Sequence, residues 1–90
     1  MKILDKKIIA PNVHEMTLFA PEIAAKALPG QFGIAIPDEF SERTPVTLSD
    51  WDTVNGSVTV VFLEIGAATK GLADLKTGEE IYSFSGPLGK

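Results

Sequence analysis

The sequence predicts an all-β domain, a six-stranded antiparallel Greek-key barrel with one short helix before the last strand. Three observations support this fold class. Short apolar segments recur between turn residues such as Pro, Gly and Asn. The longest β-branched run, residues 57–65, has the alternation of a strand. Directly after Gly66, and before the final strand, apolar residues are spaced as in a helix. Short strands joined by turns, with one inserted helix, are typical of small barrels.

The N-terminal half of the chain predicts three strands. Pro11-Asn12 is a turn signal between the first two, and Pro37-Asp38 ends the third. Because the first turn of a helix tolerates proline, one or two helical turns beginning at Pro21 are expected between the second and third strands. The expected strands are residues 2–10, 13–19 and 31–36, and the helical turns are residues 21–27.

The C-terminal half predicts three more strands and the short helix. Asn55-Gly56 is a hairpin signal because both residues accept positive φ. Thr69 is expected to be the N-cap of the helix, which Thr77-Gly78 closes. The remaining expected elements are a loop at 39–44, strands at 46–51, 57–65 and 81–85, and a linker at 86–90.

Alternate residues of the strand at 57–65 lie on opposite faces, and both faces are largely apolar. This strand is therefore expected at the centre of the sheet or under a ligand. The single histidine, His14, is expected on a strand surface. Large aromatic side chains are expected in core or rim packing. These are Phe32, Trp51, Phe62 and Phe84.

The length, charge and cysteine content of the chain argue against several classes of function. The chain has 90 residues, a net charge of −4 and no cysteine. One domain is expected, without disulfides, thiolate zinc sites or iron–sulfur ligation of its own. The acidic balance argues against nucleic-acid binding, and no segment approaches the roughly 20 apolar residues of a membrane span. The N-terminus lacks the apolar run of a signal peptide, so a cytoplasmic location is expected.

Two segments form the candidate binding site. Residues 43–47 supply the guanidinium of Arg43, a proline-fixed backbone and the hydroxyl of Thr47 at the start of a strand. Residues 66–69 supply small side chains and Thr69 where a strand leads into a helix. A guanidinium and a helix N-terminus both favour a diphosphate, and Thr47 is placed to meet a planar ring. A flavin site is the leading interpretation.

Each of these residues also has an ordinary structural explanation. Arg43 in a loop is typical of a solvated surface charge, and Thr47 of β-propensity. Thr69 can cap a helix for about 1 kcal/mol without any ligand. The acidic residues near Arg43 are typical of a solvated loop, and they could also mask Arg43 when no ligand is bound. These are Asp38, Glu39 and Glu42.

Four motifs occur in the same order as in flavin domains of the ferredoxin–NADP reductase superfamily, which the whole chain resembles. They are Pro29–Phe32, Arg43–Thr47, Gly66–Leu72 and Gly86–Gly89. Within the superfamily the chain is similar to the small flavin subunit of NADH-dependent ferredoxin–NADP oxidoreductase, also named a sulfide dehydrogenase subunit. It is also similar to the electron-transfer subunit of dihydroorotate dehydrogenase.

The resemblance implies that residues 1–85 form an FAD-binding β-barrel domain and that residues 86–90 begin a linker to an absent nucleotide-binding domain. It implies electron transfer between NAD(P)H and ferredoxin or a partner subunit, with FAD preferred over FMN. The nicotinamide and an iron–sulfur cluster would bind beyond these residues or in the partner. The fragment is not expected to be a competent enzyme alone, and uncovered apolar surface favours its self-association.

The resemblance also assigns roles. Arg43 would pair with the flavin pyrophosphate, and Thr47, the candidate catalytic residue, would meet the ring edge near the atom that receives hydride. Val46 stands where plant-type reductases carry a ring-stacking aromatic, and Arg43 lies one residue further from the hydroxyl than in that subgroup. The expected cofactor-binding residues are Arg43, Thr44, Pro45, Val46, Thr47, Val61, Phe62, Leu63, Gly66, Ala68 and Thr69.

Several choices stay open at the level of sequence. These are FAD or FMN, NADH or NADPH, and the identity of the electron acceptor. The alternative function is a β-barrel that serves as a protein-interaction or assembly module and binds no flavin. A yellow protein with the visible absorption bands of flavin distinguishes the two functions.

Overall fold

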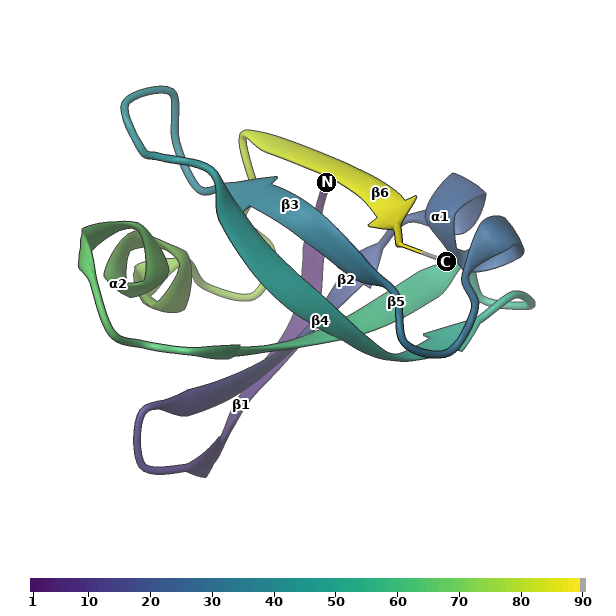
Figure 1. The fold of residues 1–90 in the computed structure, drawn as a ribbon, viewed down its shortest axis with the longest axis horizontal. Coiled ribbons are helices and arrows are strands. Elements are labelled where there is room, and N and C mark those ends of the chain that lie inside the picture. The colour runs from purple at the N-terminus through teal and green to yellow at the C-terminus, as the bar shows by residue number, and fades with distance from the viewer. Residues whose placement is uncertain (90) are drawn as a thin grey trace.

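In the computed structural model, which describes residues 1–89, the chain is mainly β (Figure 1). Six strands and two short helices have the bounds β1 Ile3–Ala10, β2 Val13–Phe19, α1 Pro21–Lys26, β3 Phe32–Ile36, β4 Thr44–Asp52, β5 Ser57–Leu63, α2 Ala67–Asp74 and β6 Ser83–Leu88. The prediction of six strands with a short helix before the last is confirmed. Within residues 1–89, neither helix has the length and apolar character needed to cross a bilayer.

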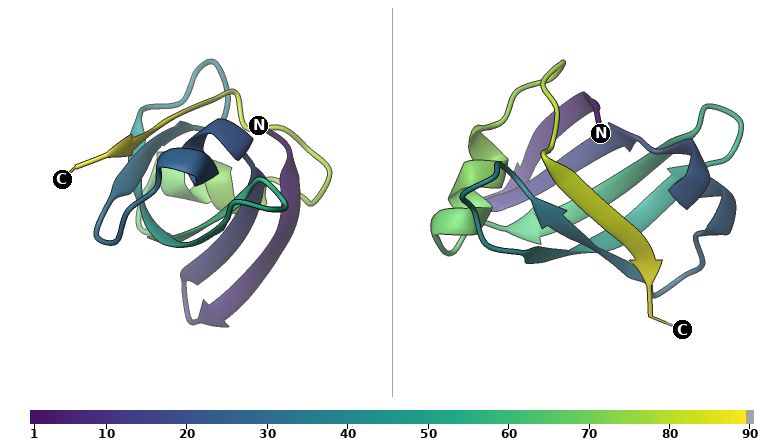
Figure 2. Two further views of the ribbon diagram at one scale, coloured as in Figure 1. Left: turned by 90° about the vertical axis from the view of Figure 1, so that its right-hand side faces the viewer. Right: turned by 90° about the horizontal axis from the view of Figure 1, so that it is seen from above.

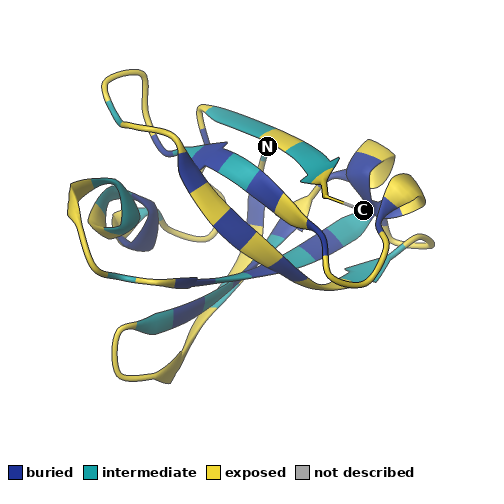
Figure 3. Ribbon diagram, in the orientation of Figure 1, coloured by how far each residue is buried: buried dark blue, intermediate teal, exposed yellow. Residues whose placement is uncertain are grey.

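The six strands form one sheet in the order β1-β2-β5-β4-β3-β6, with every neighbouring pair antiparallel. The sheet coils around its own interior, with α2 at one end and α1 at the other (Figure 1, Figure 2). Buried apolar residues of the sheet and of both helices form one core cluster, and the buried positions are dark blue in Figure 3. Burying a large apolar side chain stabilises a fold by about 1.5–3 kcal/mol, so this interior is the core of the domain.

The sheet is not closed, so the predicted barrel is not confirmed. Strands β1 and β6 are its two edges. The start of the chain instead contacts the segment between α2 and β6, through a bridge between Lys2 and Glu80 and a hydrogen bond of 2.9 Å from Ile81 N to Met1 O. That segment, and not β6, forms hydrogen bonds with the start of the chain. Strand β6 pairs with β3, so the two edge strands do not pair with each other.

Along β5, alternate side chains point into the core and toward the outer surface. Val58, Val60 and Phe62 point into the core and are buried, as parity predicted. Val61 and Leu63 lie on the outer face and are more exposed. Since β5 pairs with β2 on one side and β4 on the other, its predicted central position is confirmed.

His14 is buried, which corrects the expectation that it lies on a strand surface. It shares its face of β2 with Met16 and Leu18, and only 7% of the residue is exposed. Its Nε2 lies 2.8 Å from Oε1 of Glu64, and its ring stacks on Phe62 with the centroids 5.2 Å apart. A polar ring is tolerated in the core because Glu64 gives it a partner.

Strand β6 extends to Leu88, although Gly86 was expected to end it. An edge strand accepts Pro87, because a missing N–H costs nothing on the side that has no neighbouring strand. An irregularity in the register between Phe32 and Ile34 of β3 accommodates the extra length. Whether residues 86–90 lead into a further domain stays a prediction.

The β4–β5 hairpin forms where Asn55-Gly56 predicted it, but the turn has four residues, 53–56. Gly56 takes a positive φ of 68°, whereas Asn55 does not. Strand β4 begins at Thr44, inside the expected loop, and β5 ends at Leu63 rather than at residue 65. The start of β4 and the end of β5 therefore each lie two residues earlier in the sequence than expected.

Candidate functional site

The loop that carries Arg43 and the turn at Gly66 lie at the same end of the sheet (Figure 1). Strand β4 begins directly after Arg43, and β5 ends shortly before Gly66. Because the two strands are antiparallel, with Thr47 opposite Val61, the start of β4 and the end of β5 are neighbours. The topology therefore brings together the two segments that the sequence analysis paired.

A pocket of about 340 Å³ lies between these segments. One wall is residues 40–42 of the loop, and the other is Ala67 and Ala68 at the start of α2. A methyl group added at Gly71 would lie 3.8 Å from both Pro37 and Ser41, so α2 packs against the loop at Gly71. The pocket is thus a surface hollow between a helix N-terminus and the residues that precede Arg43; Glu42 lines it, whereas Arg43 itself lies next to its lining residues in sequence.

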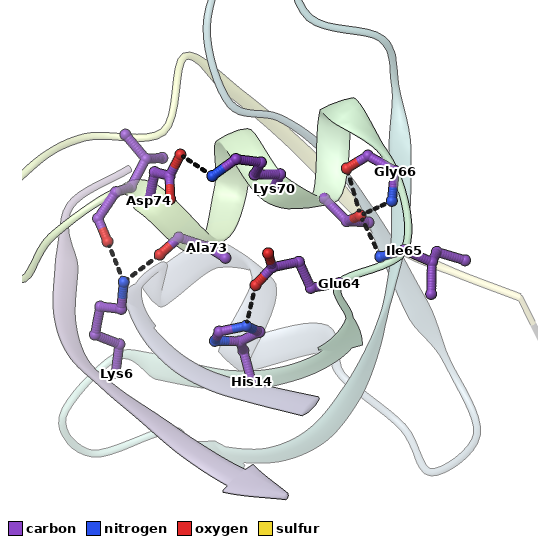
Figure 4. A network of polar contacts seen from close by, with 10 residues as sticks. Lys6, His14, Glu64, Ile65, Gly66, Lys70, Ala73 and Asp74 are labelled. Carbon is purple, nitrogen blue, oxygen red and sulfur yellow. Dashed lines mark hydrogen bonds and ion pairs between the residues drawn. The ribbon is translucent and has the colours of Figure 1, made fainter. Parts of the chain in front are cut away.

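The turn that contains Ile65 and Gly66 (Figure 4) is held by hydrogen bonds to Thr69. Thr69 Oγ1 accepts hydrogen bonds of 2.9 Å from the backbone N–H groups of Ile65 and Gly66, and donates one of 3.0 Å to Gly66 O. Gly66 is the N-cap and Thr69 the third helical residue, which corrects the prediction that Thr69 is the N-cap. Because its hydroxyl hydrogen is already donated, Thr69 shapes the turn and can offer a ligand only its backbone N–H.

The N-terminus of α2 is suited to an anion. The first backbone N–H groups of a helix, here those of Ala67 and Ala68, have no acceptor inside the helix. The partial positive charge of the helix dipole lies at the same place. Since both residues line the pocket, an anionic group in it meets unsatisfied donors.

Arg43 is exposed and makes no hydrogen bond or ion pair with any residue of 1–89. The acidic side chains that precede it in the loop, Asp38, Glu39 and Glu42, are exposed as well and do not pair with it. Masking of Arg43 by these acids is therefore not seen. A guanidinium without a protein partner can give two parallel hydrogen bonds to a phosphate.

The outer face of β3, β4 and β5 carries an apolar strip beside the pocket. Phe32, Thr47 and Val61 lie in one row across the three strands, because Phe32 and Val61 are the register partners of Thr47 on either side. Ile34 and Pro45 pair in the next row toward the pocket. Thr47 thus presents an exposed hydroxyl between the apolar side chains of Phe32 and Val61, a surface suited to a flat ring with one polar edge.

The predicted site residues divide between the two faces of the sheet. The side chains of Pro45, Thr47, Val61 and Leu63 lie on the outer face, as does the strip. The side chains of Thr44, Val46 and Phe62 are buried, with exposures of 5%, 2% and 5%. Successive strand residues point to opposite faces, so three consecutive residues cannot all present side chains to one ligand. Of the buried three, only backbone groups are left for a ligand.

Six residues of this surface were not predicted as site residues from the sequence. Phe32 and Ile34 line the strip, and the pocket is lined by Phe40, Ser41, Glu42 and Ala67. The parity of the third strand, together with its pairing to the strand that carries Thr47, could have indicated the first two. Ala67 follows from the true start of α2, which was displaced by the assignment of the N-cap to Thr69.

No family model matches the chain, but relatives do. An uncharacterized protein in the adh 3' region of Clostridium beijerinckii is 44% identical over 88 residues, which are 98% of this chain and 30% of that protein. A dihydroorotate dehydrogenase B electron transfer subunit homolog of Thermotoga maritima is 33% identical over 88 residues, again 98% of this chain and 31% of that protein.

The chain is a homologue of dihydroorotate dehydrogenase B electron transfer subunits. It spans about a third of the length of the curated relatives it matches.

The solved structure of an NADH-dependent reduced ferredoxin–NADP oxidoreductase, described for its flavin-based electron bifurcation, superimposes with a TM-score of 0.94 at 32% identity. The match covers 99% of this chain and 32% of the other. The fold is therefore the flavin-binding fold of the ferredoxin–NADP reductase type, and the resemblance stated from the four motifs is confirmed.

The residues present fit a flavin nucleotide. A free guanidinium and free helix amides suit its phosphates, and the strip suits its ring. Pro45 of the strip follows Glu42 of the pocket by three residues in sequence, so both lie near the start of β4.

Proposed function

We propose that this chain binds FAD and is the flavin-binding part of an NAD(P)H-dependent electron-transfer oxidoreductase. One observation carries the proposal: β4 begins at the loop that carries Arg43, beside a pocket lined by the start of α2, and places the hydroxyl of Thr47 between the apolar side chains of Phe32 and Val61. An anionic chain and a flat ring are the two ends of a flavin nucleotide. The homologous electron transfer subunits support the same proposal.

In this proposal Arg43 and the backbone N–H groups of Ala67 and Ala68 hold the diphosphate. Thr47 hydrogen-bonds the polar edge of the ring, with Pro45 and Val61 against its apolar part. When bound, the flavin supplies the hydride and single-electron chemistry, while these residues bind it, orient it and keep water from one side of the ring.

We propose FAD rather than FMN as the bound flavin, because of the number of phosphates. FMN carries a monophosphate, whereas FAD carries a diphosphate that can engage the arginine and the helix amides together. Titrating the protein with each nucleotide and following the visible absorption bands tests this. FAD binding at least tenfold tighter than FMN binding is expected, and equal affinities would remove the diphosphate argument.

The path of electrons extends beyond this chain. We propose that a nicotinamide and an iron–sulfur cluster bind outside residues 1–90 or in a partner, and that ferredoxin or a partner subunit exchanges electrons with the flavin. The names of the relatives as electron transfer subunits support a partner subunit. Adding NADH to the FAD-loaded chain tests whether the nicotinamide site lies outside these residues. If it does, little reduction of the flavin is expected. A cytoplasmic location belongs to the same proposal.

The alternative function, an interaction module without flavin, has one observation in its favour. Ile8 and Ile9 on the edge strand β1 are 72% and 51% exposed. Exposed apolar side chains on an unpaired edge are suited to pairing with another chain. A protein that shows no flavin absorption after incubation with FAD, and that associates through β1, would favour this function over the first.

A further inference from the structure

Phe32 differs from the other large aromatic residues that the sequence placed in core or rim packing. Phe62 is buried, and Trp51 and Phe84 pack against the core. Phe32 instead lies on the outer face of β3 with 37% of its surface exposed. An exposed aromatic ring on a sheet surface is available to a ligand, so its neighbours decide what it could contact.

The neighbours of Phe32 place it beside the proposed ring site. Its register partner on β4 is Thr47, and the next residue in that row is Val61 on β5. Neighbouring strands are about 4.8 Å apart, so a row across three strands spans roughly 10 Å. That length matches three fused six-membered rings, which places Phe32 at one end of such a ring system and the hydroxyl of Thr47 at its middle.

The position of Phe32 is fixed by the end of the chain. Leu88 of β6 is its register partner on the other side, and a methyl group added at Gly89 would lie 3.5 Å from its ring. Gln31, which is 7% exposed, donates a hydrogen bond of 2.8 Å to Gly89 O and accepts one of 2.7 Å from Leu28 N. The ring therefore has a packed edge and an open face, and it loses little freedom when a ligand covers that face.

Resting on the proposed function, we propose that Phe32 contacts the flavin ring and sets the affinity of the site for it. Aromatic pairs prefer offset or edge-to-face contacts, which a ring at the end of the Thr47 row can make. The neighbouring motif residue Val46 cannot do so, because its side chain is 2% exposed and points into the core. Removing the ring in Phe32→Ala should weaken FAD binding by roughly 2- to 13-fold, in the range of a lost aromatic contact.

The experiment compares the wild type with Phe32→Ala, Phe32→Trp and Phe19→Trp. Phe19 is a matched control, because it is also an exposed aromatic, with 49% exposure, and it lies beside α1 in another pocket. FAD is titrated into each variant, and the bound form is examined for fluorescence and for a broad long-wavelength charge-transfer band. Phe32→Trp is expected to bind FAD, quench its emission and show the band, whereas Phe19→Trp behaves as the wild type.

The outcomes separate the two proposals. If the wild type binds FAD, and Phe32→Trp binds it without quenching or a new band while Phe32→Ala keeps the wild-type affinity, the role of Phe32 is wrong and the flavin site stands. If no variant binds FAD, including the wild type, the proposed function and this inference both fail. Circular dichroism of Phe32→Ala matching the wild type establishes that a lost affinity is not a lost fold.

Discussion

Nε2 of His14 lies 2.8 Å from Oε1 of Glu64, which stands two residues before the N-cap of α2 (Figure 4). The contact ties the buried face of β2 to the segment that leads into the pocket. Nδ1 of the same ring is buried without a partner among residues 1–89. The polar contacts of this core histidine thus depend on Glu64.

Glu64→Ala should lower the free energy of unfolding by about 1–3 kcal/mol, because it leaves a buried imidazole without any partner. Urea unfolding followed by circular dichroism measures the change as a shift in midpoint at constant slope. Glu39→Ala is the control, since Glu39 is an exposed loop residue. A Glu64→Ala midpoint as high as that of the control would mean that His14 does not rely on this contact.

Arg43→Ala should weaken FAD binding by about 1.5–3 kcal/mol, or roughly 10- to 150-fold, the value of a charge-assisted hydrogen bond. Arg43 has no partner in residues 1–89, so the substitution should leave the unfolding midpoint unchanged. An absorbance titration measures the affinity. Lys76→Ala removes an exposed positive charge elsewhere and should bind FAD as the wild type does. Equal losses in both variants would point to net charge rather than to a phosphate contact.

Thr47→Val should change the reduction potential of the bound flavin more than its affinity. Valine keeps the branched shape on the outer face of β4 but removes the hydroxyl that we propose meets the ring edge. Spectroelectrochemical titration of FAD-loaded protein measures the potential. Thr53→Val, in the exposed turn after β4, is the matched control. A potential identical in Thr47→Val and in the control would exclude the hydroxyl from the ring contact.

The stability that the β4–β5 turn contributes to the fold should depend on pH through the carboxyl group of Asp52. Hydrogen bonds from the backbone and side chain of Asn55 lower the pKa of this carboxyl, and that from the Val54 backbone adds to them. A carboxyl with a lowered pKa stabilises the fold above its unfolded pKa of about 3.9, and the contribution disappears as pH falls through the folded value. Asp52→Asn should therefore unfold more easily than the wild type at neutral pH, with the difference shrinking below about pH 4. Thermal unfolding across pH 2–7 checks this, and a constant difference would contradict it.

Local patterns predicted the strands well because the relevant contacts are local or repeat with a short period. Alternation placed Val58, Val60 and Phe62 in the core, and Asn55-Gly56 located the hairpin. His14 was misplaced because its partner, Glu64, is 50 residues away in sequence. Pairing between distant segments is the information that a single strand pattern does not carry.

In the candidate site, too, local motifs were predicted from the sequence, whereas contacts that depend on strand pairing were not. The motifs identified Arg43 and the Gly66 turn, and the antiparallel pairing of β4 with β5 brings them together. The list of site residues followed the motif as a continuous run, and so it included Val46 and Phe62, whose side chains face the core. Phe32 was left out because its closeness to Thr47 depends on the register between β3 and β4.

Self-association of the isolated chain should depend on the β1 edge. The β1–β2 hairpin extends beyond the rest of the sheet (Figure 1, Figure 2), and Ile8 and Ile9 are exposed on it. Two such edges can pair with each other through their free backbone groups, and exposed isoleucines favour the contact. Ile8→Lys should lower the mass measured by light scattering at high concentration, because charged residues discourage pairing at an edge. Val54→Lys, at an exposed apolar residue in the β4–β5 turn, should leave the mass unchanged. A wild type that stays monomeric at all concentrations would show that this edge does not drive association.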